Sequence, residues 1–248
     1  MRTRLTFYVI LLLTLGSCAS HWQVTEVFGE NCVLDSNEAD EPSIEHVIQP
    51  YRDSLGAEIK RVLCMNEVDM TKGRPESAMG NWFADALLQE ARKTYAGQID
   101  FALFNHGGIR TSLSKGEVTV GNLFELMPFE NELVVVTLPY IETQNLIRYL
   151  VITGGEPVSD LKVNLNDSTF SSVLIGALPL EKRDYHVLTS DYLSNGGDNM
   201  IFFTEGHRTQ RLNLDLKVRD ALTEHCTALG EQGMPIQGMK DGRLYHGQ

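Results

Sequence analysis

A short apolar run that ends in a polar, glycine-rich turn constrains this chain more than any other stretch. Residues 101–104 have the length and apolarity of a buried strand, and Asn105, Gly107 and Gly108 follow directly. The two glycines let the backbone turn where a side chain would clash, so the strand end presents an amide and bare backbone N–H groups. Arg110 adds a planar five-donor guanidinium suited to phosphate or carboxylate oxygens. The stretch therefore predicts a binding site at the end of a buried strand.

Two further segments place aromatic residues on turns. Phe129 follows Pro128, which fixes φ and favours a loop where the ring is available for stacking. A second predicted strand, residues 185–190, is followed by Tyr192, a glycine pair and Asp198, whose carboxylate can accept from two adjacent ribose hydroxyls. Taken singly, a glycine pair is usually only a turn and a Phe after Pro is usually core. The repeated pattern favours a site for a flat, anionic ligand.

Three strings carry a resemblance to a known family. NHGGIR, MPFENELVVV and YLSNGGDN, in this order and at these separations, resemble the C-terminal, substrate-binding domain of the 5'-nucleotidase and UDP-sugar hydrolase family. The string PESAMGNWFADAL extends the similarity, which spans about residues 43–205. The resemblance implies an α+β fold, a single mixed α/β domain over residues 42–248.

The resemblance also implies roles in binding the base and the ribose. In that family two aromatic rings sandwich the nucleobase, which implies this role for Phe129 and Tyr192. Tyr192 replaces the more usual Phe, keeping the stacking face and adding a hydroxyl. Asp198 matches the aspartate that binds the ribose hydroxyls, and Asn105 matches an asparagine that contacts the base.

Two arginines are implied to face the phosphates. Arg110 matches an arginine that reaches phosphate or ribose oxygens, and Arg74 is the candidate for a second one, although its spacing to Asn81 varies among relatives. His106 stands where relatives often have Gly, which would bring an imidazole near the ligand. The expected substrate-binding residues are Asn105, Gly107, Gly108, Arg110, Phe129, Tyr192, Asn195, Gly197, Asp198 and Arg74.

The chain offers no catalytic residue for hydrolysis in this interpretation. Full-length relatives carry an N-terminal metallophosphatase domain with two metal ions, for which 248 residues leave no room. Fragments such as Asp184-Tyr185-His186 and Gly206-His207 occur in the wrong order and separation for a two-metal site. We therefore expect no cofactor and no metal site in this chain, and divalent metals in a separately encoded metallophosphatase partner.

The N-terminus predicts export. A charged start, an apolar run and Leu-Gly-Ser before Cys18 resemble a lipoprotein signal over residues 1–17, with lipid attached to Cys18 and a tether over residues 18–41. An ordinary secretory signal with a chance cysteine is the alternative. The lipoprotein interpretation places the chain in the bacterial cell envelope, on the periplasmic face or the outer membrane. Cys32, Cys64 and Cys226 then allow at most one intramolecular bridge, with the pairing left open.

The charge balance argues against a nucleic-acid polymer as partner. The formal net charge is -12, and removal of Arg2 and Arg4 with the signal leaves 19 basic against 33 acidic residues, or -14. A polymer backbone of phosphates demands a basic footprint. A mononucleotide needs only a local positive pocket around Arg110.

Periodicity and turn signals predict mixed secondary structure. We expect the helix that begins at Pro42 to kink or end at Pro50. Further helices are expected around 79–90, 121–126, 139–154 and 212–229, and strands at 59–70, 101–104, 115–120, 131–138, 161–165, 171–175, 185–190 and 201–203.

The leading hypothesis is the nucleotide-recognising half of a 5'-nucleotidase-like hydrolase of nucleotide catabolism, with hydrolysis supplied by the separate metallophosphatase. The alternatives are a stand-alone nucleoside- or nucleotide-binding lipoprotein and a purely structural subunit. Stacking tolerates any base, so the preferred base and the number of phosphates stay open.

Overall fold

The computed structural model describes residues 41–166 and 170–247. The expected signal peptide, the lipidation at Cys18, the tether up to residue 40 and Cys32 lie outside the described residues. The chain divides into two compact units, Met1–Ile48 and Gln49–Gln248, and the second contains every strand described below. Cys64 and Cys226 are both buried free thiols.

The first helix of the described residues, α2 (Pro42–Ile59), has 18 residues and does not end at Pro50, which it contains. Its apolar residues Val47, Tyr51 and Leu55 are exposed. Within the described part of the chain, no helix is both long enough and apolar enough to cross a membrane.

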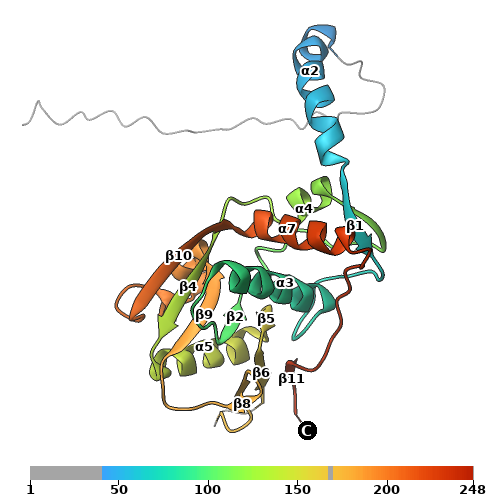
Figure 1. Ribbon diagram of the computed structural model, residues 1–248. Helices are drawn as coiled ribbons and strands as arrows, with labels where there is room; N and C mark the ends of the chain where they lie inside the picture. The colour runs from blue at the N-terminus through green and yellow to red at the C-terminus, as the bar shows by residue number, and fades with distance from the viewer. Residues whose placement is uncertain (1–40, 167–169, 248) are drawn as a thin grey trace, which may run out of the picture. The chain divides into compact units, whose positions relative to one another are not determined.

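A mixed five-stranded sheet forms the centre of the second unit (Figure 1). Its strands, from edge to edge, are β10 (Gln210–Lys217), β4 (Glu132–Leu138), β9 (Tyr185–Ser190), β2 (Phe101–Leu103) and β5 (Val158–Ser159). The pairs β10–β4, β4–β9 and β2–β5 are antiparallel, and β9–β2 is parallel. Together with the helices this arrangement confirms the predicted α+β fold.

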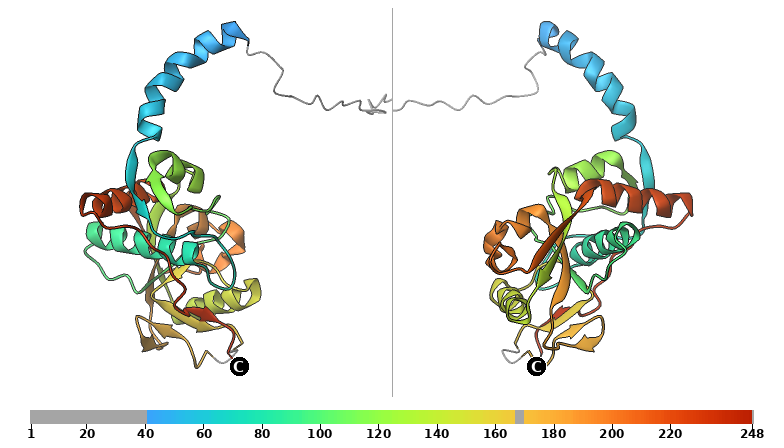
Figure 2. Two further views of the ribbon diagram at one scale, coloured as in Figure 1. Left: turned by 90° about the vertical axis from the view of Figure 1, so that its right-hand side faces the viewer. Right: turned by 60° about the vertical axis from the view of Figure 1, so that its left-hand side comes forward.

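Strand alternation divides the apolar residues into two cores, one on each face of the sheet. In β4, Leu133 and Val135 belong to one core, whereas Val134 and Val136 belong to the other. Helices α3 (Ala78–Thr94) and α7 (Val218–Glu231) contribute to the first core, and α5 (Tyr140–Thr153) contributes to the second. Figure 2 shows α3 and α7 on one side of the strands and α5 on the other. Both faces are therefore covered by helices.

Smaller elements complete the unit. Beside the first core, β1 (Val62–Asn66) pairs with β3 (Gly116–Thr119), and α4 (Val120–Leu126) follows β3. A second small sheet has the strand order β11 (Leu244–Tyr245), β6 (Leu161–Asn164), β7 (Leu174–Ile175) and β8 (Leu178–Pro179). Three short helices follow β9, namely α6 (Asp191–Ser194), η1 (Gly197–Asn199) and η2 (Ile201–Phe203).

Two predicted elements were wrong. The strand expected at 201–203 is the 3-10 helix η2, whose consecutive residues Phe202 and Phe203 are both buried, which an alternating strand with one solvent face does not allow. The helix expected over 212–229 begins only at Val218, because residues 210–217 form β10 against β4. The alternation of Leu212, Leu214 and Leu216 with polar residues is the strand signal that a helical reading overlooks.

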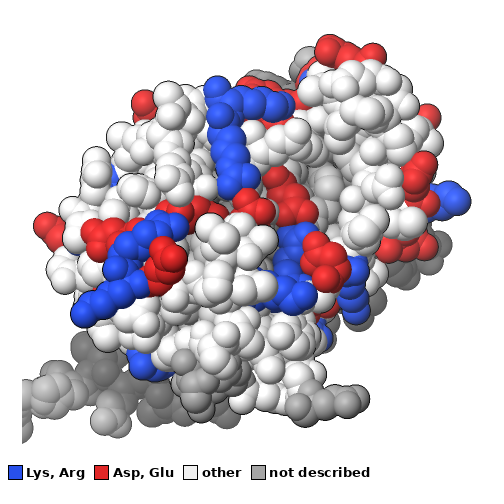
Figure 3. All heavy atoms as spheres, turned by 60° about the horizontal axis from the view of Figure 1, so that its bottom comes forward, with Lys and Arg blue, Asp and Glu red and all other residues white. Residues whose placement is uncertain are grey.

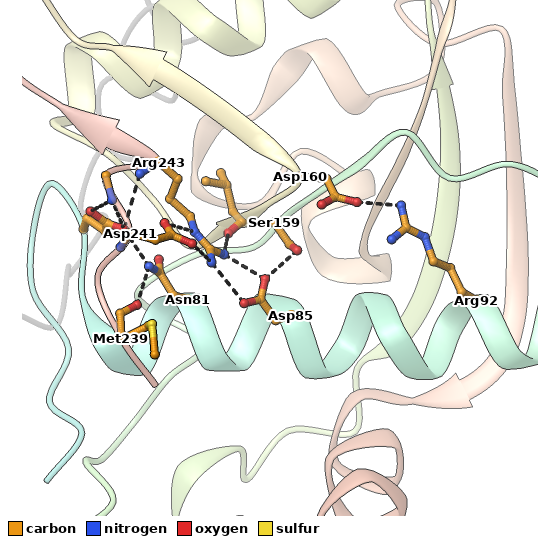
Figure 4. A network of polar contacts seen from close by, with 11 residues as sticks. Asn81, Asp85, Arg92, Ser159, Asp160, Met239, Asp241 and Arg243 are labelled. Atoms are coloured by element: carbon orange, nitrogen blue, oxygen red, sulfur yellow. Dashed lines mark hydrogen bonds and ion pairs between the residues drawn. The ribbon is translucent and has the colours of Figure 1, made fainter. Parts of the chain in front are cut away.

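A polar network fastens the C-terminal segment to α3 (Figure 4). Arg243 donates to both carboxylate oxygens of Asp85 at 2.7 and 3.0 Å and to Asp241 at 2.6 and 2.9 Å. Asn81 donates to the carbonyl of Met239 at 2.9 Å. Behind this network, the buried Glu76 accepts from the side chain of Asn81 at 2.6 Å and from the backbone N–H of Asp241 at 2.9 Å. The last strand is therefore anchored by charged hydrogen bonds in addition to its ladder.

We expect Glu76→Ala to lower the free energy of unfolding by about 1–3 kcal/mol, because it leaves several donors without an acceptor. The matched control is Glu117→Ala, which removes an exposed carboxylate from β3 and should change stability by less than about 0.5 kcal/mol. Urea denaturation followed by circular dichroism measures both, and amide hydrogen exchange at Asp241 locates the loosening. Equal urea midpoints for the two variants would contradict the anchoring role of Glu76.

Candidate functional site

Three chain segments meet at one end of the strands of the central sheet. Strands β2 and β9 run parallel, so Asn105 after β2 and Asp191 after β9 leave the sheet at the same end, where the C-termini of both strands lie. Strand β4 is antiparallel to β9 and pairs Leu133 with Ser190, so its first residue, Glu132, lies at that end too. The loop before β4 and the loops after β2 and β9 are thereby brought together, although they lie far apart in the sequence.

The turn after β2 folds closely around its own asparagine. Asn105 is buried, and a Cβ atom added to Gly108 would lie 2.9 Å from its side-chain oxygen. An added Cβ on Gly107 would lie 3.1 Å from the side-chain nitrogen of the same residue. A side chain at either glycine would therefore press on the amide of Asn105, most closely at Gly108.

The loop before β4 is fixed by a buried arginine. Arg219 of α7 donates to the carbonyl of Met127 at 3.2 Å and to that of Phe129 at 3.3 Å, and it pairs with Glu130. The Arg219 side chain is buried, whereas Phe129 is 40% exposed. A rigid backbone thus presents the ring to solvent.

The segment after β9 is shaped by a helix cap and a left-handed turn. Ser190 caps α6 by accepting from the N–H of Leu193 at 3.2 Å, which starts the turn that carries Tyr192. Gly196 has φ +91°, and Asp198 has φ +52°, a conformation that non-glycine residues adopt at a cost. An added Cβ on Gly197 would lie 2.4 Å from the ring of Tyr192, so only glycine fits beneath that ring.

The three segments enclose a pocket of about 300 Å³. Its lining residues are Asn105, Gly107, Gly108, Arg110, Phe129, Asn131, Tyr192 and Asp198. The volume lies at the small end of the range for ligand pockets. Tyr192 is 46% exposed, so both aromatic residues that the sequence singled out line the same pocket with rings open to solvent.

Asp198 is the centre of the hydrogen bonding in this pocket. One carboxylate oxygen accepts from the Asn105 amide at 2.5 Å, and the other accepts from the Tyr192 hydroxyl at 2.9 Å. The hydrogen bond to Asp198 raises the pKa of Tyr192, so this phenol is a donor at neutral pH. The carboxylate is thereby oriented by two different loops.

Arg110 is the cation of the pocket lining. Its guanidinium donates to the carbonyl of Gly107 at 3.2 Å and lies 5.8 Å from the centre of the Phe129 ring. The side chain is otherwise exposed, which leaves donors free to meet an anion.

Three residues that the sequence predicted for the site do not line the pocket, namely Arg74, Asn195 and Gly197. Gly197 supports the Tyr192 ring, as described above. Arg74 donates to Glu156 at 2.6 Å and to the carbonyl of Thr153, so its guanidinium is engaged behind the turn that follows β2.

His106 and Asn131 differ from expectation in opposite ways. His106 is not among the lining residues, and burial, together with the charges of Arg74 and Lys72, lowers its pKa to about 4. Asn131 lines the pocket, although the sequence analysis did not single it out. Its position two residues after Phe129, in the loop that precedes a buried strand, was the available signal.

Several larger hollows lie elsewhere, and two of them are much larger than this pocket. One of about 790 Å³ is lined by β1 and the end of α7, and one of about 1010 Å³ lies between α3 and the strands β6 and β7. In the latter, Arg92 pairs with Asp160 at 2.7 Å and Arg243 pairs with Asp85 and Asp241 (Figure 4). These ion pairs engage most of its charged side chains, so we place the candidate site at the pocket of about 300 Å³, where polar and aromatic groups converge. Among residues 41–166 and 170–247, no group of three or more His, Cys, Asp or Glu residues is arranged to hold a metal ion.

Comparisons with known proteins identify the family. The family model described as "5'-nucleotidase, C-terminal domain" matches residues 56–205. The apyrase of Tabanus yao is 22% identical over 85% of this chain and 46% of its own length, and a 5'-nucleotidase of Vibrio cholerae is 26% identical over 52% of this chain and 24% of its own length.

Among solved structures, the 5'-nucleotidase precursor from Thermus thermophilus is similar, with a TM-score of 0.66 and 25% identity over 82% of this chain and 42% of that one. The chain thus spans less than half the length of these relatives. The matched residues include all three segments that form the pocket, and the chain belongs to the family of the 5'-nucleotidase C-terminal domain.

Proposed function

We propose that this domain binds a nucleotide or nucleoside as the substrate-recognition part of a 5'-nucleotidase-like hydrolase. The observation that carries the proposal is the pocket itself, where two solvent-open aromatic rings, a hydrogen-bonded carboxylate and an arginine line one small volume. Family membership supports a nucleotide ligand independently of this geometry.

The base lies against Phe129 and Tyr192 in the proposed complex. Stacking of a base on an aromatic side chain is worth about 1–3 kcal/mol and tolerates any base. The amides of Asn105 and Asn131 line the same pocket and can donate and accept along a base edge. Asn105 already donates to Asp198, so Asn131 is the more available of the two amides for the base.

The ribose is held by Asp198. Each carboxylate oxygen has more than one lone pair, so each can accept from a ribose hydroxyl while keeping its protein donor. Asn105 and Tyr192 orient the carboxylate from both sides before any ligand arrives. Preorganisation of this kind reduces the entropy lost on binding.

The phosphate faces Arg110, which is exposed at the rim of the pocket lining. On the molecular face drawn in Figure 3, Lys and Arg side chains lie interspersed with Asp and Glu, without a continuous basic stretch across that face. Such a surface favours a small anionic ligand over a nucleic-acid polymer. Two stacking faces at about 1–3 kcal/mol each and one exposed arginine contact supply less than the roughly 8 kcal/mol of micromolar affinity, so hydrogen bonds to the ribose and the base supply the rest.

The catalytic partner and the cellular location of the protein complete the proposal. In this proposal hydrolysis comes from a separately encoded metallophosphatase, which takes the place of the N-terminal domain of full-length relatives, and the lipidated Cys18 holds the domain in the cell envelope. The alternative of a stand-alone nucleoside- or nucleotide-binding lipoprotein shares the pocket and differs only in lacking the hydrolase. Co-purification of a metallophosphatase with the full chain separates the two.

Calorimetry with adenosine and AMP tests the pocket directly. We expect Phe129→Ala and Tyr192→Ala each to weaken binding by roughly 5- to 100-fold, because each removes one stacking face. Tyr51→Ala is the control, since Tyr51 is an aromatic residue of α2 that is 68% exposed and does not line the pocket. If the wild-type chain releases no heat with either ligand, or if all three variants bind alike, the proposed site is wrong.

The division of labour makes a separate prediction. The purified chain with added Zn²⁺, Mn²⁺ or Co²⁺ should release phosphate from AMP no faster than the metal solutions alone, and addition of the metallophosphatase partner should produce turnover. Asp198→Ala should raise the KM for AMP in that mixture by roughly 10-fold or more, because it weakens substrate binding. Enzymatic phosphate release by the chain alone would overturn the assignment of hydrolysis to a partner.

A further inference from the structure

The C-terminal end of α5 lies behind two of the three segments that form the pocket. Tyr149 belongs to the last turns of this helix, and Glu156 follows it after a glycine pair. Neither residue lines the pocket, and neither belongs to the strings that carry the family resemblance. Each nevertheless bonds to the backbone of a segment that does line it.

Tyr149 fastens the turn that contains Asp198. Its hydroxyl donates to the backbone carbonyl of Asp198 at 3.0 Å, and its ring meets Phe202 edge to face with centroids 5.6 Å apart. One side chain thus fixes both ends of the segment that runs from the left-handed turn into η2. Burial and the nearby carboxylates raise the pKa of Tyr149 to about 12, so the hydroxyl remains a donor at any physiological pH.

Glu156 fastens the turn that follows β2. Its buried carboxylate accepts from the backbone N–H of His106 at 2.8 Å through one oxygen and from Arg74 at 2.6 Å through the other. Arg74 also donates to the carbonyl of Thr153 at the last turn of α5, where a cation is favoured by the helix dipole. The ion pair therefore joins the end of the helix to the residue next to Asn105.

These contacts act on one carboxylate. Asn105 donates to Asp198, so a shift of the turn held by Glu156 moves a donor of Asp198, and a shift of the turn held by Tyr149 moves Asp198 itself. Asp198 and Asn199 both have positive φ, at +52° and +61°, and non-glycine residues keep this conformation only when their surroundings enforce it. The bond from Tyr149 to the Asp198 carbonyl is a restraint of that kind.

We infer that Tyr149 and Glu156 are positioning residues, which hold Asp198 in the orientation that selects ligands with a ribose diol. The inference rests on the proposed nucleotide site and deepens it. It assigns ribose selectivity to Tyr149 of α5 and to Glu156 just after that helix, both outside the pocket, and it assigns Arg74 to the support of Glu156.

The test compares the affinities of adenosine and 2',3'-dideoxyadenosine, which differ only in the ribose hydroxyls. For Tyr149→Phe and Glu156→Gln we expect adenosine binding to weaken by roughly 3- to 10-fold, while dideoxyadenosine binding changes by less than about twofold. The ratio of the two affinities should therefore fall in both variants. A purely structural role would weaken both ligands together and leave the ratio unchanged.

The control variant is Tyr140→Phe, which makes the same substitution on the same helix, where the hydroxyl accepts from Gln144 at 3.1 Å. It should keep the wild-type ratio. In an Asp198→Asn background, Tyr149→Phe should have less than about a twofold further effect on adenosine, because the group that it positions is already altered.

The outcomes separate this inference from the function on which it rests. No binding of adenosine by the wild-type chain overturns the proposed function and the inference together. Binding by the wild type with an unchanged affinity ratio in both Tyr149→Phe and Glu156→Gln overturns the inference alone. Thermal denaturation of each variant before calorimetry confirms that the ratio is measured on folded protein.

Discussion

The parallel pairing of β2 with β9 is the constraint on which the rest of the site depends. The register places Phe101 beside Val187 and Ala102 beside Leu188, and all four side chains are buried. A slip of one residue would exchange the residues that face the two cores, so the apolar pattern specifies the register. The same register fixes where both strands end, and the two polar turns that follow them emerge side by side. Burial of apolar residues in the sheet thus determines the geometry of a polar site at the ends of its strands.

Asp198 converts this closeness into a defined structure. Its side chain accepts from Asn105 on one turn and from Tyr192 on its own segment, and its carbonyl accepts from Tyr149 of α5. The turns can come this close because Gly107 and Gly197 carry no Cβ where Asn105 and the Tyr192 ring approach. A strained backbone, two donors to the carboxylate and a third donor to the carbonyl of the same residue are the features of a preorganised site, in which the surrounding structure enforces an unfavourable local conformation.

The sequence predicted what local patterns control. The apolar strands before both glycine turns, the helix that ends at Gly154 and the pocket position of Phe129 and Tyr192 follow from periodicity, turn chemistry and motif resemblance. What it missed depends on tertiary partners. Residues 210–217 alternate like a strand, and their pairing with β4, a partner far away in the sequence, separates them from the helix that follows. Arg74 lies behind the site because Glu156, 82 positions later, binds it.

The distribution of charge around the pocket bears on what such a domain contributes to a hydrolase. Among the eight lining residues Arg110 is the cation, and an exposed ionic contact is worth about 0–1 kcal/mol, less than stacking on either aromatic ring. In the proposed complex the base and the ribose therefore supply most of the affinity, and the phosphate supplies little. A strongly acidic chain can bind an anionic nucleotide in this way, because most of its contacts are with the uncharged base and ribose. The phosphate is then left accessible at the rim, where a separate catalytic centre can reach it.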